Sequence, residues 1–459
     1  MRFPCVRTMM IKFLIGLPVL GIVVFIHELG HFIVARLCGV SVESFSIGWG
    51  PVLLRKKIGA TEYRLSAIPL GGYCGMKGEH AFREAYEKKL SSVPKEEGSL
   101  FAAHPFKRIL IAFAGPFANL LLAAAALAMI SGLGRTYYTT DNRIVPVYCL
   151  DPSDQSPARA AGLQMGDRIL KINDENTANF ADIQQIIALH PEETLTMLIE
   201  RGNEQLGTTI RPDLNKKTGA GQVGIYRYVP LQIDSVRKDS AADLAGIKAG
   251  DRITGVDGTA LDNQLSLIYF FRDYTQKTAL FELIRGGERI ELPVNLVRTE
   301  NGSVDLGLNW KYITVTEEGT GFLDSLRQGI VQTGKLTAVT LKSLGLLFKG
   351  VSMTEAVAGP VRISSMIGSL ASDGFSENAR AGFVNVAEIV AVICVSLFLM
   401  NLLPIPILDG GLIFTAFIEC IVRRQIPPRI LYYMQFVGVA FIAVLFVFAL
   451  WADILYIMK

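Results

Sequence analysis

The residues whose types and spacing most clearly suggest a catalytic site are His27-Glu28-Leu29-Gly30-His31, which lie inside an apolar run from Phe13 to Ala35. Residues four apart share one face of a helix, so the two imidazoles can hold one zinc ion while Glu28 reaches a water beside it. An ionisable group at bilayer depth is costly unless it faces protein or water. The pattern therefore predicts a zinc hydrolase whose active site is buried in a membrane.

Alternatively, the two histidines could simply hydrogen-bond neighbouring residues and bind no metal. The H-E-x-x-H pattern by itself also does not identify a family, because it occurs in many unrelated zinc enzymes. The whole chain has only five histidines, and two of them flank Glu28 at this spacing. Their position inside an apolar span makes the purely structural alternative weaker.

A catalytic zinc site needs a third protein ligand and an open fourth position. We expect the third ligand to be Asp409, in the stretch Asn401-Leu-Leu-Pro404-Ile-Pro406-Ile-Leu-Asp409-Gly410-Gly411. The two prolines cannot continue a regular helix, and irregular backbone in a membrane is tolerated only where it lines a protein cavity. Asn401 could stabilise an oxyanion or hold the substrate backbone. The alternative is that Asp409 is simply a charge at a helix end.

The composition is that of a membrane protein with a sizeable soluble part. The chain has 459 residues, of which 50% are hydrophobic, and a mean hydropathy of +0.36. The net charge of +3 is small, and no basic stripe alternates with aromatic residues, so no nucleic-acid partner is expected. The six cysteines lack any C-x-x-C or metal-ligand spacing, which argues against a disulfide framework.

Four stretches are long enough to cross a bilayer, which takes about 20 apolar residues. The first could be a signal peptide, but it has no small-residue cleavage site and stays apolar past the histidine pair. The stretches are 13–35, 109–133, 389–408 and 430–451.

The distribution of basic residues predicts the orientation of these spans. Lysine and arginine are concentrated between Cys38 and Lys107 and in the short loop with Arg423, Arg424 and Arg429. The positive-inside rule makes both loops cytoplasmic and places the segment between the second and third spans outside the cytoplasm. The basic N-terminal tail favours the opposite orientation.

The segment between the second and third spans contains an internal repeat. Residues 156–169 align with residues 240–253 at an offset of 84, with the shared pattern S-x-A-x-x-A-G-[LI]-x-x-G-D-x-I. This pattern resembles the core of PDZ domains, which bind an extended chain or a C-terminus along a sheet edge. It predicts two PDZ modules, at 134–214 and 222–297.

Peptide binding is expected mainly at the second module. There Val223-Gly224-Ile225 resembles the carboxylate-binding loop and its strand, whereas the first module shows no such segment. Either module could instead be a rigid spacer. Beyond them, residues 298–385 are expected to form a helical juxtamembrane segment, amphipathic from Gly321 to Gly374, which lies on the outer membrane surface or packs against the PDZ pair.

Taken together, H-E-L-G-H in the first span, N-L-L-P-I-P-I-L-D-G-G in the third and two PDZ copies between them resemble the site-2 protease family, in its sigma-E regulating branch. Lesser motifs extend the resemblance to nearly the whole chain. Ser46–Pro51 resembles the family's G-x-G segment, Ile68–Tyr73 its membrane-dipping β-loop, Phe113–Asn119 its second-span motif, and Gly359–Val361 its segment before the third span.

This resemblance implies a site and a cofactor. His27, His31 and Asp409 would bind one Zn²⁺ per chain, and Glu28 would be the catalytic carboxylate. The residues that would contact substrate are Gly48, Trp49, Gly50, Gly71, Gly72, Tyr73 and Asn401. Two departures bear on substrate positioning: Ser396 stands where many members have asparagine, and Cys74-Gly75 replaces the usual Val-Lys.

The expected fold is a polytopic α-helical membrane protein of four spans, with a cytoplasmic-side membrane-dipping β-loop and two extracytoplasmic α+β PDZ domains. The remaining predicted segments are 1–37 with the first span, 38–108 with a β-hairpin, 109–133, 386–411 with the third span, and 412–459 with the fourth.

The resemblance implies an intramembrane endopeptidase of the bacterial cytoplasmic membrane. Its substrates would be single-span membrane proteins already trimmed outside the membrane, such as anti-sigma factors or signal-peptide remnants. A membrane-anchored PDZ scaffold is an alternative, but it would not need Glu28 or the Asp409 segment. A zinc transporter would need polar residues along several spans, and the second and fourth offer almost none.

Overall fold

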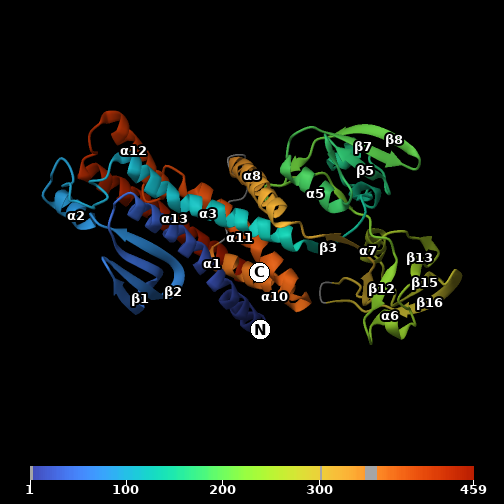
Figure 1. Ribbon diagram of the computed structural model, residues 1–459. Helices are drawn as coiled ribbons and strands as arrows, with labels where there is room; N and C mark the ends of the chain where they lie inside the picture. The colour runs from blue at the N-terminus through green and yellow to red at the C-terminus, as the bar shows by residue number, and fades with distance from the viewer. Residues whose placement is uncertain (1–3, 300–301, 347–358, 459) are drawn as a thin grey trace. The chain divides into compact units, whose positions relative to one another are not determined.

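The computed structural model describes residues 4–299, 302–346 and 359–458 (Figure 1). The chain forms two units. One contains the residues up to Arg135 and from Glu317 onward, and the other runs from Thr136 to Thr316. The chain leaves the first unit through β3 (Arg135–Thr139) and returns through β18 (Ile313–Glu317), two strands that pair with each other.

The first unit is built from long apolar helices, as the hydropathy pattern predicts. Among the described residues, four helices are long and apolar enough to cross a membrane, which confirms the expected number of spans. They lie within α1 (Pro4–Leu37), α3 (Pro105–Leu133), α11 (Ala379–Asn401) and α13 (Pro428–Met458).

The third span ends earlier than predicted. Helix α11 stops at Asn401, and a new helix, α12 (Asp409–Val422), begins at Asp409, so this residue lies in the first turn of a separate helix and not within the predicted span 386–411. Between the two helices, short-range backbone bonds replace the helical pattern, such as Ile405 N–H to the Leu403 carbonyl at 2.7 Å. The cause is the pair Pro404 and Pro406, which lack the N–H groups that a helix needs.

Helix α3 packs against α1, α8 (Phe322–Leu346), α11 and α12 (Figure 1). Small residues allow the backbones of α1 and α3 to approach closely, which is how helices associate in lipid. A Cβ atom added to Gly30 would lie 2.4 Å from the Ala114 carbonyl oxygen. This close contact fixes the depth and rotation of the helix that carries the histidine pair.

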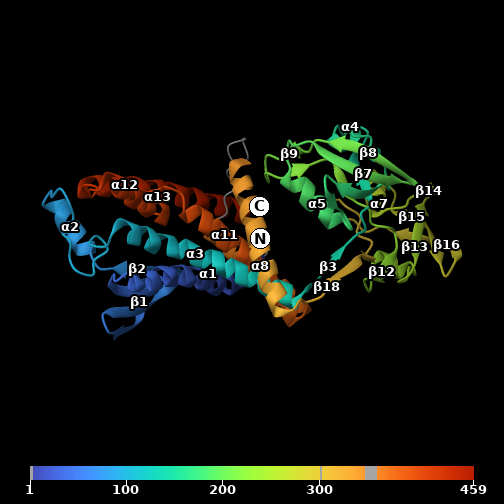
Figure 2. The ribbon, with the colours of Figure 1, turned by 45° about the horizontal axis from the view of Figure 1, so that its top comes forward.

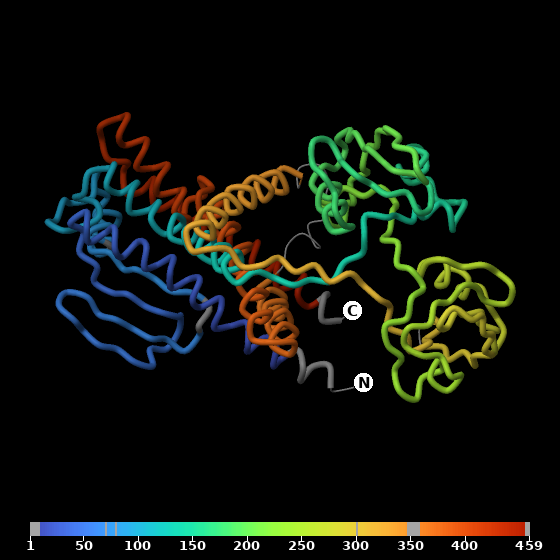
Figure 3. The backbone as a smooth tube through the Cα atoms, turned by 45° about the vertical axis from the view of Figure 1, so that its right-hand side comes forward, coloured from blue at the N-terminus to red at the C-terminus, as the bar shows by residue number. Residues whose placement is uncertain are grey.

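The predicted β-hairpin is a twisted sheet made by β1 (Val42–Ile58) and β2 (Thr61–Met76), which lies alongside α1 (Figures 1 and 3). Residues 44–47 pair with 62–65 on one side and with 72–75 on the other. The segment 72–76 is therefore an outer edge of the sheet. Large apolar side chains near the turn, including Leu53 and Leu54, are exposed.

The predicted juxtamembrane segment 298–385 begins with strands, β17 (Leu308–Trp310) and β18, and not with a helix. Helices α8 and α10 (Pro360–Glu377) follow, and residues 347–358 of the predicted amphipathic stretch lie outside the described residues. Helix α8 packs on α3 and α11 (Figure 2). The small residue Gly329 lets it approach α3 closely, since a Cβ atom added there would be 2.5 Å from the Ala124 carbonyl oxygen. Its packing partner is thus the helix bundle.

The second unit contains two α+β bodies with the same element order, as the 84-residue repeat predicts, except that the first has two additional short strands, β9 and β10. Their four-stranded sheets have the orders β6-β5-β7-β8 and β14-β13-β15-β16. The first body has β4 (Ile144–Pro146), α4 (Pro157–Ala160), β5 (Arg168–Ile172), β6 (Glu175–Asn176), α5 (Phe180–Leu189), β7 (Leu195–Arg201), β8 (Glu204–Ile210), β9 (Asp213–Leu214), β10 (Gly221–Gln222) and β11 (Ile225–Arg227). The second has β12 (Ile233–Val236), α6 (Ala241–Leu244), β13 (Arg252–Val256), β14 (Thr259–Ala260), α7 (Gln264–Arg272), β15 (Thr278–Arg285), β16 (Glu288–Asn295) and β17.

The boundary between these bodies differs from the prediction. The last strand of each body returns to pair with its first strand, β11 with β4 and β17 with β12. Val223-Gly224-Ile225, assigned from the sequence to the second module, therefore belongs to the first, where Val223 lies in the core. Its equivalent in the second body is Leu306-Gly307-Leu308, because Ala158 N–H bonds the Val223 carbonyl just as Ala242 N–H bonds that of Leu306.

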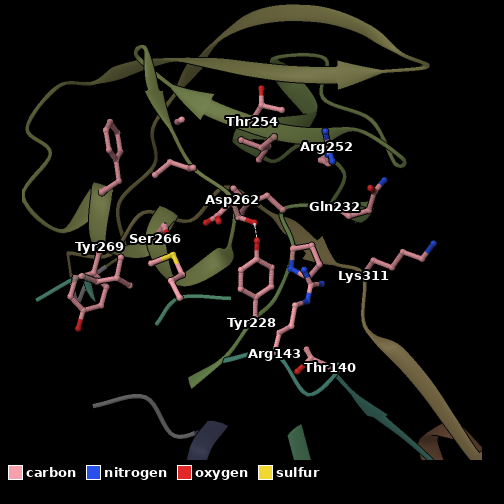
Figure 4. A pocket seen from close by; sticks show the side chains of 18 of the residues that line it. Thr140, Arg143, Tyr228, Gln232, Arg252, Thr254, Asp262, Ser266, Tyr269 and Lys311 are labelled. Atoms are coloured by element: carbon pink, nitrogen blue, oxygen red, sulfur yellow. Dashed lines mark hydrogen bonds between the residues drawn. The ribbon is translucent and has the colours of Figure 1, made fainter. Parts of the chain in front are cut away.

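A cavity of about 1280 Å³ lies between the two bodies of the second unit (Figure 4). The guanidinium of Arg143 in the first body sits 4.3 Å from the ring centroid of Tyr228, and the Tyr228 hydroxyl donates to the Asp262 carbonyl in the second. Burial, with the nearby Asp262 charge, raises the pKa of Tyr228 to about 12, so the phenol keeps its donor proton. These contacts join the bodies at one side of the cavity.

Each body also holds the same ion pair, in which a buried aspartate contacts a half-buried arginine: Asp167 with Arg201 and Asp251 with Arg285. Burial tends to raise the pKa of Asp251, but hydrogen bonds from Arg285 and from the Lys248 amide outweigh it, so the pKa lies below its usual value. The folded protein therefore favours the ionised form more than the unfolded chain does. The pair stabilises the fold above the unfolded pKa of about 3.9, and this stabilisation is lost as the pH falls through the lower folded pKa.

Replacing Arg285 with methionine is expected to lower the free energy of unfolding of the second body by about 1–3 kcal/mol, because it removes the charged partner of the buried Asp251 carboxylate. Hydrogen exchange of the β13 and β15 amides measures this, and the effect should shrink under acid conditions that protonate Asp251. The matched control is Arg237→Met, which breaks an exposed pair with Asp305 and should cost less than about 1 kcal/mol. An equal decrease in the free energy of unfolding in the two variants would contradict a special stabilising role for the Asp251–Arg285 pair.

Candidate active site

The structure brings His27, His31 and Asp409 together, although the first two and the third are far apart in the sequence. The Nε2 atoms of the two histidines are 3.3 Å apart. One Asp409 carboxylate oxygen lies 3.3 Å from His27 Nε2 and the other lies 3.3 Å from His31 Nε2. Among the described residues, this is the single group of three or more His, Cys, Asp or Glu side chains that could hold a metal ion.

The spacing of these donor atoms fits zinc. Two imidazole nitrogens and a carboxylate oxygen are a common catalytic zinc donor set, and ligand atoms around a tetrahedral zinc ion lie roughly 3.3 Å apart. The observed separations of 3.3 Å match that value. Three protein ligands also leave the fourth position of such an ion open, as catalysis requires.

Helix α3 lies directly behind the two histidines. The Nδ1 atom of His31 is 2.8 Å from the carbonyl oxygen of Ile111, and the Nδ1 atom of His27 is 3.2 Å from the side-chain amide of Asn119. Gly115 lies between these positions, and a Cβ atom added there would be 2.2 Å from His31 Nε2. A glycine is thus required for the close fit of α3 against the His31 ring.

Replacing Gly115 with alanine is expected to reduce zinc affinity by at least about 10-fold, because the methyl group displaces the ring of a ligand that its surroundings hold in place. Zinc competition with a chromophoric chelator measures the change in the purified protein. Gly345→Ala is the matched control, since a Cβ atom there meets nothing within 4 Å. Unchanged zinc affinity in Gly115→Ala would contradict this packing.

Glu28 faces the same site from α1. Its carboxylate interacts electrostatically with His27, His31 and Asp409, and it accepts a hydrogen bond from the backbone N–H of Cys74. A cavity of about 680 Å³ opens onto these groups. Its walls come from α1, the 73–78 segment, α2 (Glu79–Glu87), α3, the residues around Asp409 and the start of α13.

The residues predicted to contact substrate fall into two groups. Tyr73 and Asn401 line the cavity, together with Cys74 and Gly75, two positions where this chain departs from the family pattern. Gly72 lies just behind, where an added Cβ atom would be 3.2 Å from Glu28 Cγ.

The other predicted contact residues, Gly48, Trp49, Gly50 and Gly71, are not among those that line the cavity. Trp49 and Gly71 support the edge segment instead. Trp49 Nε1 donates to the Gly72 carbonyl oxygen at 3.1 Å, and Gly71 has φ +126°, with the Trp49 ring where a side chain would be.

The sequence assigns no role to the groups that hold the candidate zinc ligands in place, although Gly115 and Asn119 belong to the Phe113–Asn119 motif. Arg108 of α3 and Glu419 of α12 form a buried ion pair, and Glu419 also accepts from the Ile426 amide at 2.8 Å. This pair ties α12, and with it Asp409, to α3. Charged residues at the edges of apolar runs were the available signal, as was the polar Asn119 inside the second span.

Comparisons with known proteins agree with this geometry. The model of peptidase family M50 matches residues 15–445. The "Putative zinc metalloprotease" of Treponema pallidum (strain Nichols) is 50% identical over 445 residues, which cover 97% of this chain and 99% of the relative. The regulator of sigma E protease of Haemophilus influenzae is 30% identical over 466 residues, which cover 97% of this chain and 98% of the relative.

The family match spans nearly the whole chain, from the first apolar helix into the last, and includes the H-E-x-x-H helix and the Asp409 segment. The resemblance found in the sequence motifs is thereby confirmed. The chain belongs to peptidase family M50, the site-2 protease family, and is a multi-pass membrane zinc metalloprotease.

Proposed function

We propose that this protein is an intramembrane endopeptidase that cuts the transmembrane helix of single-span membrane proteins. The observation that carries the proposal is the position of His27, Glu28, His31 and Asp409 on one cavity among apolar helices. A protease site reached by soluble substrates would not need to lie between helices that are long and apolar enough to cross a membrane.

In this proposal His27, His31 and Asp409 hold the zinc ion and Glu28 moves the proton. Zinc would supply a Lewis acid that polarises the scissile carbonyl and makes water nucleophilic at neutral pH. The Glu28 carboxylate would accept the proton from the attacking water and later donate it to the leaving amide nitrogen. The Asn401 side chain, which lines the cavity, would donate to the developing oxyanion or to substrate backbone.

Substrate would enter as an extended segment paired with the sheet edge at 72–76. A peptide bond within an intact helix is shielded by the hydrogen bonds of that helix, so cleavage requires local unwinding. An outer strand supplies replacement backbone partners where water is scarce. The strand containing Gly48–Gly50 pairs with other strands of the sheet, so the edge at 72–76 is the one that we assign to substrate.

The two α+β bodies would be PDZ domains that restrict access to the site by size, so that only substrates trimmed outside the membrane are cut. In the second body a groove of about 790 Å³ runs between α7 and β17, lined by Leu267, Ile268, Phe271, Gly307 and Trp310. Such a groove beside a short strand suits an extended peptide or a C-terminus.

The proposal places both PDZ domains outside the cytoplasm of a bacterial cell and the zinc site near the cytoplasmic face of the inner membrane. Cys149 is an exposed free thiol in the second unit, so a membrane-impermeant maleimide should label it in intact spheroplasts. A Cys149→Ser variant controls for the other thiols. Labelling of Cys149 that requires permeabilised membranes would reverse the orientation.

The activity is tested with zinc-loaded protein in proteoliposomes and two single-span reporters, one of which keeps a folded extramembrane domain. Mass spectrometry should find the new termini inside the span of the trimmed reporter, with little cutting of the untrimmed one. A variant without residues 136–316 should cut both. A short linker suffices in that variant because Arg135 and Glu317 already form an ion pair at 2.9 Å.

Two results would contradict the proposal. Termini only outside the span would exclude intramembrane cleavage, and continued discrimination by the deletion variant would exclude the size filter while leaving the peptidase assignment intact.

A further inference from the structure

The two zinc-binding histidines differ in what holds their second ring nitrogen. A backbone carbonyl, that of Ile111, faces Nδ1 of His31 at 2.8 Å. A carbonyl can only accept, so the Nδ1 atom of His31 must carry the proton, and the Nε2 lone pair is free to face the metal position. The surroundings of His31 therefore allow only the tautomer that binds zinc through Nε2.

The described residues give the Nδ1 atom of His27 no such fixed acceptor. Its Nδ1 atom lies 3.2 Å from the side-chain amide of Asn119, which can donate through nitrogen or accept through oxygen. When the amide nitrogen donates, the His27 proton sits on Nε2, beside the Asp409 carboxylate at 3.3 Å. When the amide oxygen accepts, the proton sits on Nδ1, and Nε2 presents a lone pair.

Asn119 is itself fully buried, and its Oδ1 atom has no hydrogen-bond partner among the described residues. Buried polar atoms without a partner are rare in folded proteins and call for an explanation. A half-turn of the amide about its Cβ–Cγ bond exchanges nitrogen and oxygen, which brings the unpartnered oxygen to His27 Nδ1.

We propose that Asn119 is a positioning residue that accepts a hydrogen bond from His27 Nδ1 and so selects the imidazole tautomer that binds zinc. The inference rests on the proposed role of His27 as a zinc ligand. It adds a residue from a third helix, α3, whose part in the site is to orient a ligand.

The inference predicts opposite effects for two substitutions at one buried position. Asn119→Leu removes the acceptor and should weaken zinc affinity by about 10–100-fold, the usual effect of losing the partner of a metal-bound histidine. Asn119→Asp keeps an acceptor oxygen toward Nδ1 and should hold zinc at least as tightly as the parent protein. A role in packing alone would make both substitutions harmful.

The experiment measures the zinc dissociation constant of the full chain in detergent by competition with a chromophoric chelator. The rise in Tm on adding zinc to the metal-free protein is recorded in parallel. Loss of packing lowers the Tm of the metal-free protein, whereas loss of ligand orientation shrinks the rise caused by zinc. Asn119→Ala removes the same acceptor with little steric demand and replaces Asn119→Leu if the leucine variant does not fold.

Two further variants separate the possible outcomes. Ser364→Ala removes another buried hydroxyl that has no hydrogen-bond partner within the part of the chain that the structure describes. The Ser364 backbone packs against α1 at Gly16, and the variant should leave zinc affinity unchanged. His27→Ala should abolish zinc binding. Full zinc retention in that variant would contradict the proposed zinc site itself. If His27→Ala loses zinc while the Asn119 variants without an acceptor bind it as tightly as the parent, the site stands and the role of Asn119 is wrong.

Discussion

Replacing Glu28 with glutamine is expected to lower the rate of peptide-bond cleavage by about 10²–10⁴-fold while one zinc ion per chain is retained. Glutamine keeps the shape of the side chain but cannot take up the proton that the attacking water loses. The hydrogen bond from the Cys74 N–H can still be accepted by the amide oxygen, so the local structure should persist.

The measurement combines cleavage of a trimmed single-span reporter in proteoliposomes with the zinc content of the same preparation. Glu43→Gln is the matched control, since Glu43 is an exposed carboxylate on β1 and not among the cavity-lining residues. The control should cleave at the parent rate. Normal turnover by Glu28→Gln would remove this residue from the mechanism.

Replacing Asp409 with alanine is expected to abolish both zinc retention and cleavage. Asp409 supplies the only carboxylate of the metal group, and loss of it leaves two imidazoles on one helix. Loss of the residue that hydrogen-bonds a metal ligand weakens metal affinity by about 10–100-fold, so loss of a ligand itself should weaken it by at least about 100-fold. Zinc content after gel filtration and the zinc dissociation constant both report the loss.

Asp453→Asn is the control for removal of a buried carboxylate. Asp453 of α13 accepts from the Gly359 and Val361 amides at 3.0 Å and so caps α10, away from the metal group. We expect this variant to lower Tm yet keep its zinc. Zinc retention by Asp409→Ala would show that the third ligand is another residue.

Much of the helical fold could be predicted from the sequence, because its signals are local. The number of spans follows from runs of apolar residues, and the histidine pair follows from spacing along one helix. Asp409 could be proposed as a partner since the nearby proline pair rules out a regular helix there. That it lies 3.3 Å from both histidines depends on how separate helices pack, which only the structure describes.

The errors in the predicted fold have a common physical origin. The strands that close the α+β bodies, such as Ile225–Arg227, have three residues each and pair with strands far away in the sequence. So short a strand has too little periodicity to be recognised, and the sequence alone therefore places Val223-Gly224-Ile225 in the second module instead of the first. Likewise, the sequence predicts that the third span continues past Asn401, because residues 402–408 are apolar. In the structure these residues are not helical.

The groups that orient the ligands were beyond sequence reasoning for a related reason. Asn119 and Arg108 stand out as polar side chains in or beside an apolar run, but the run does not say what they contact. Their partners, His27 and Glu419, are contributed by other helices. The same limit applies to Gly115. A side chain is excluded at this position only because the His31 ring of α1 occupies the space.

The most direct test is X-ray absorption at the zinc edge of the purified protein. With His27, His31 and Asp409 as ligands, we expect one zinc ion per chain, two imidazole nitrogens at about 2.0–2.1 Å, only light-atom scatterers in the first shell, and the loss of the zinc signal in Asp409→Ala. A sulfur scatterer at about 2.3 Å, or an unchanged spectrum in Asp409→Ala, would contradict a metal centre built from these two helices.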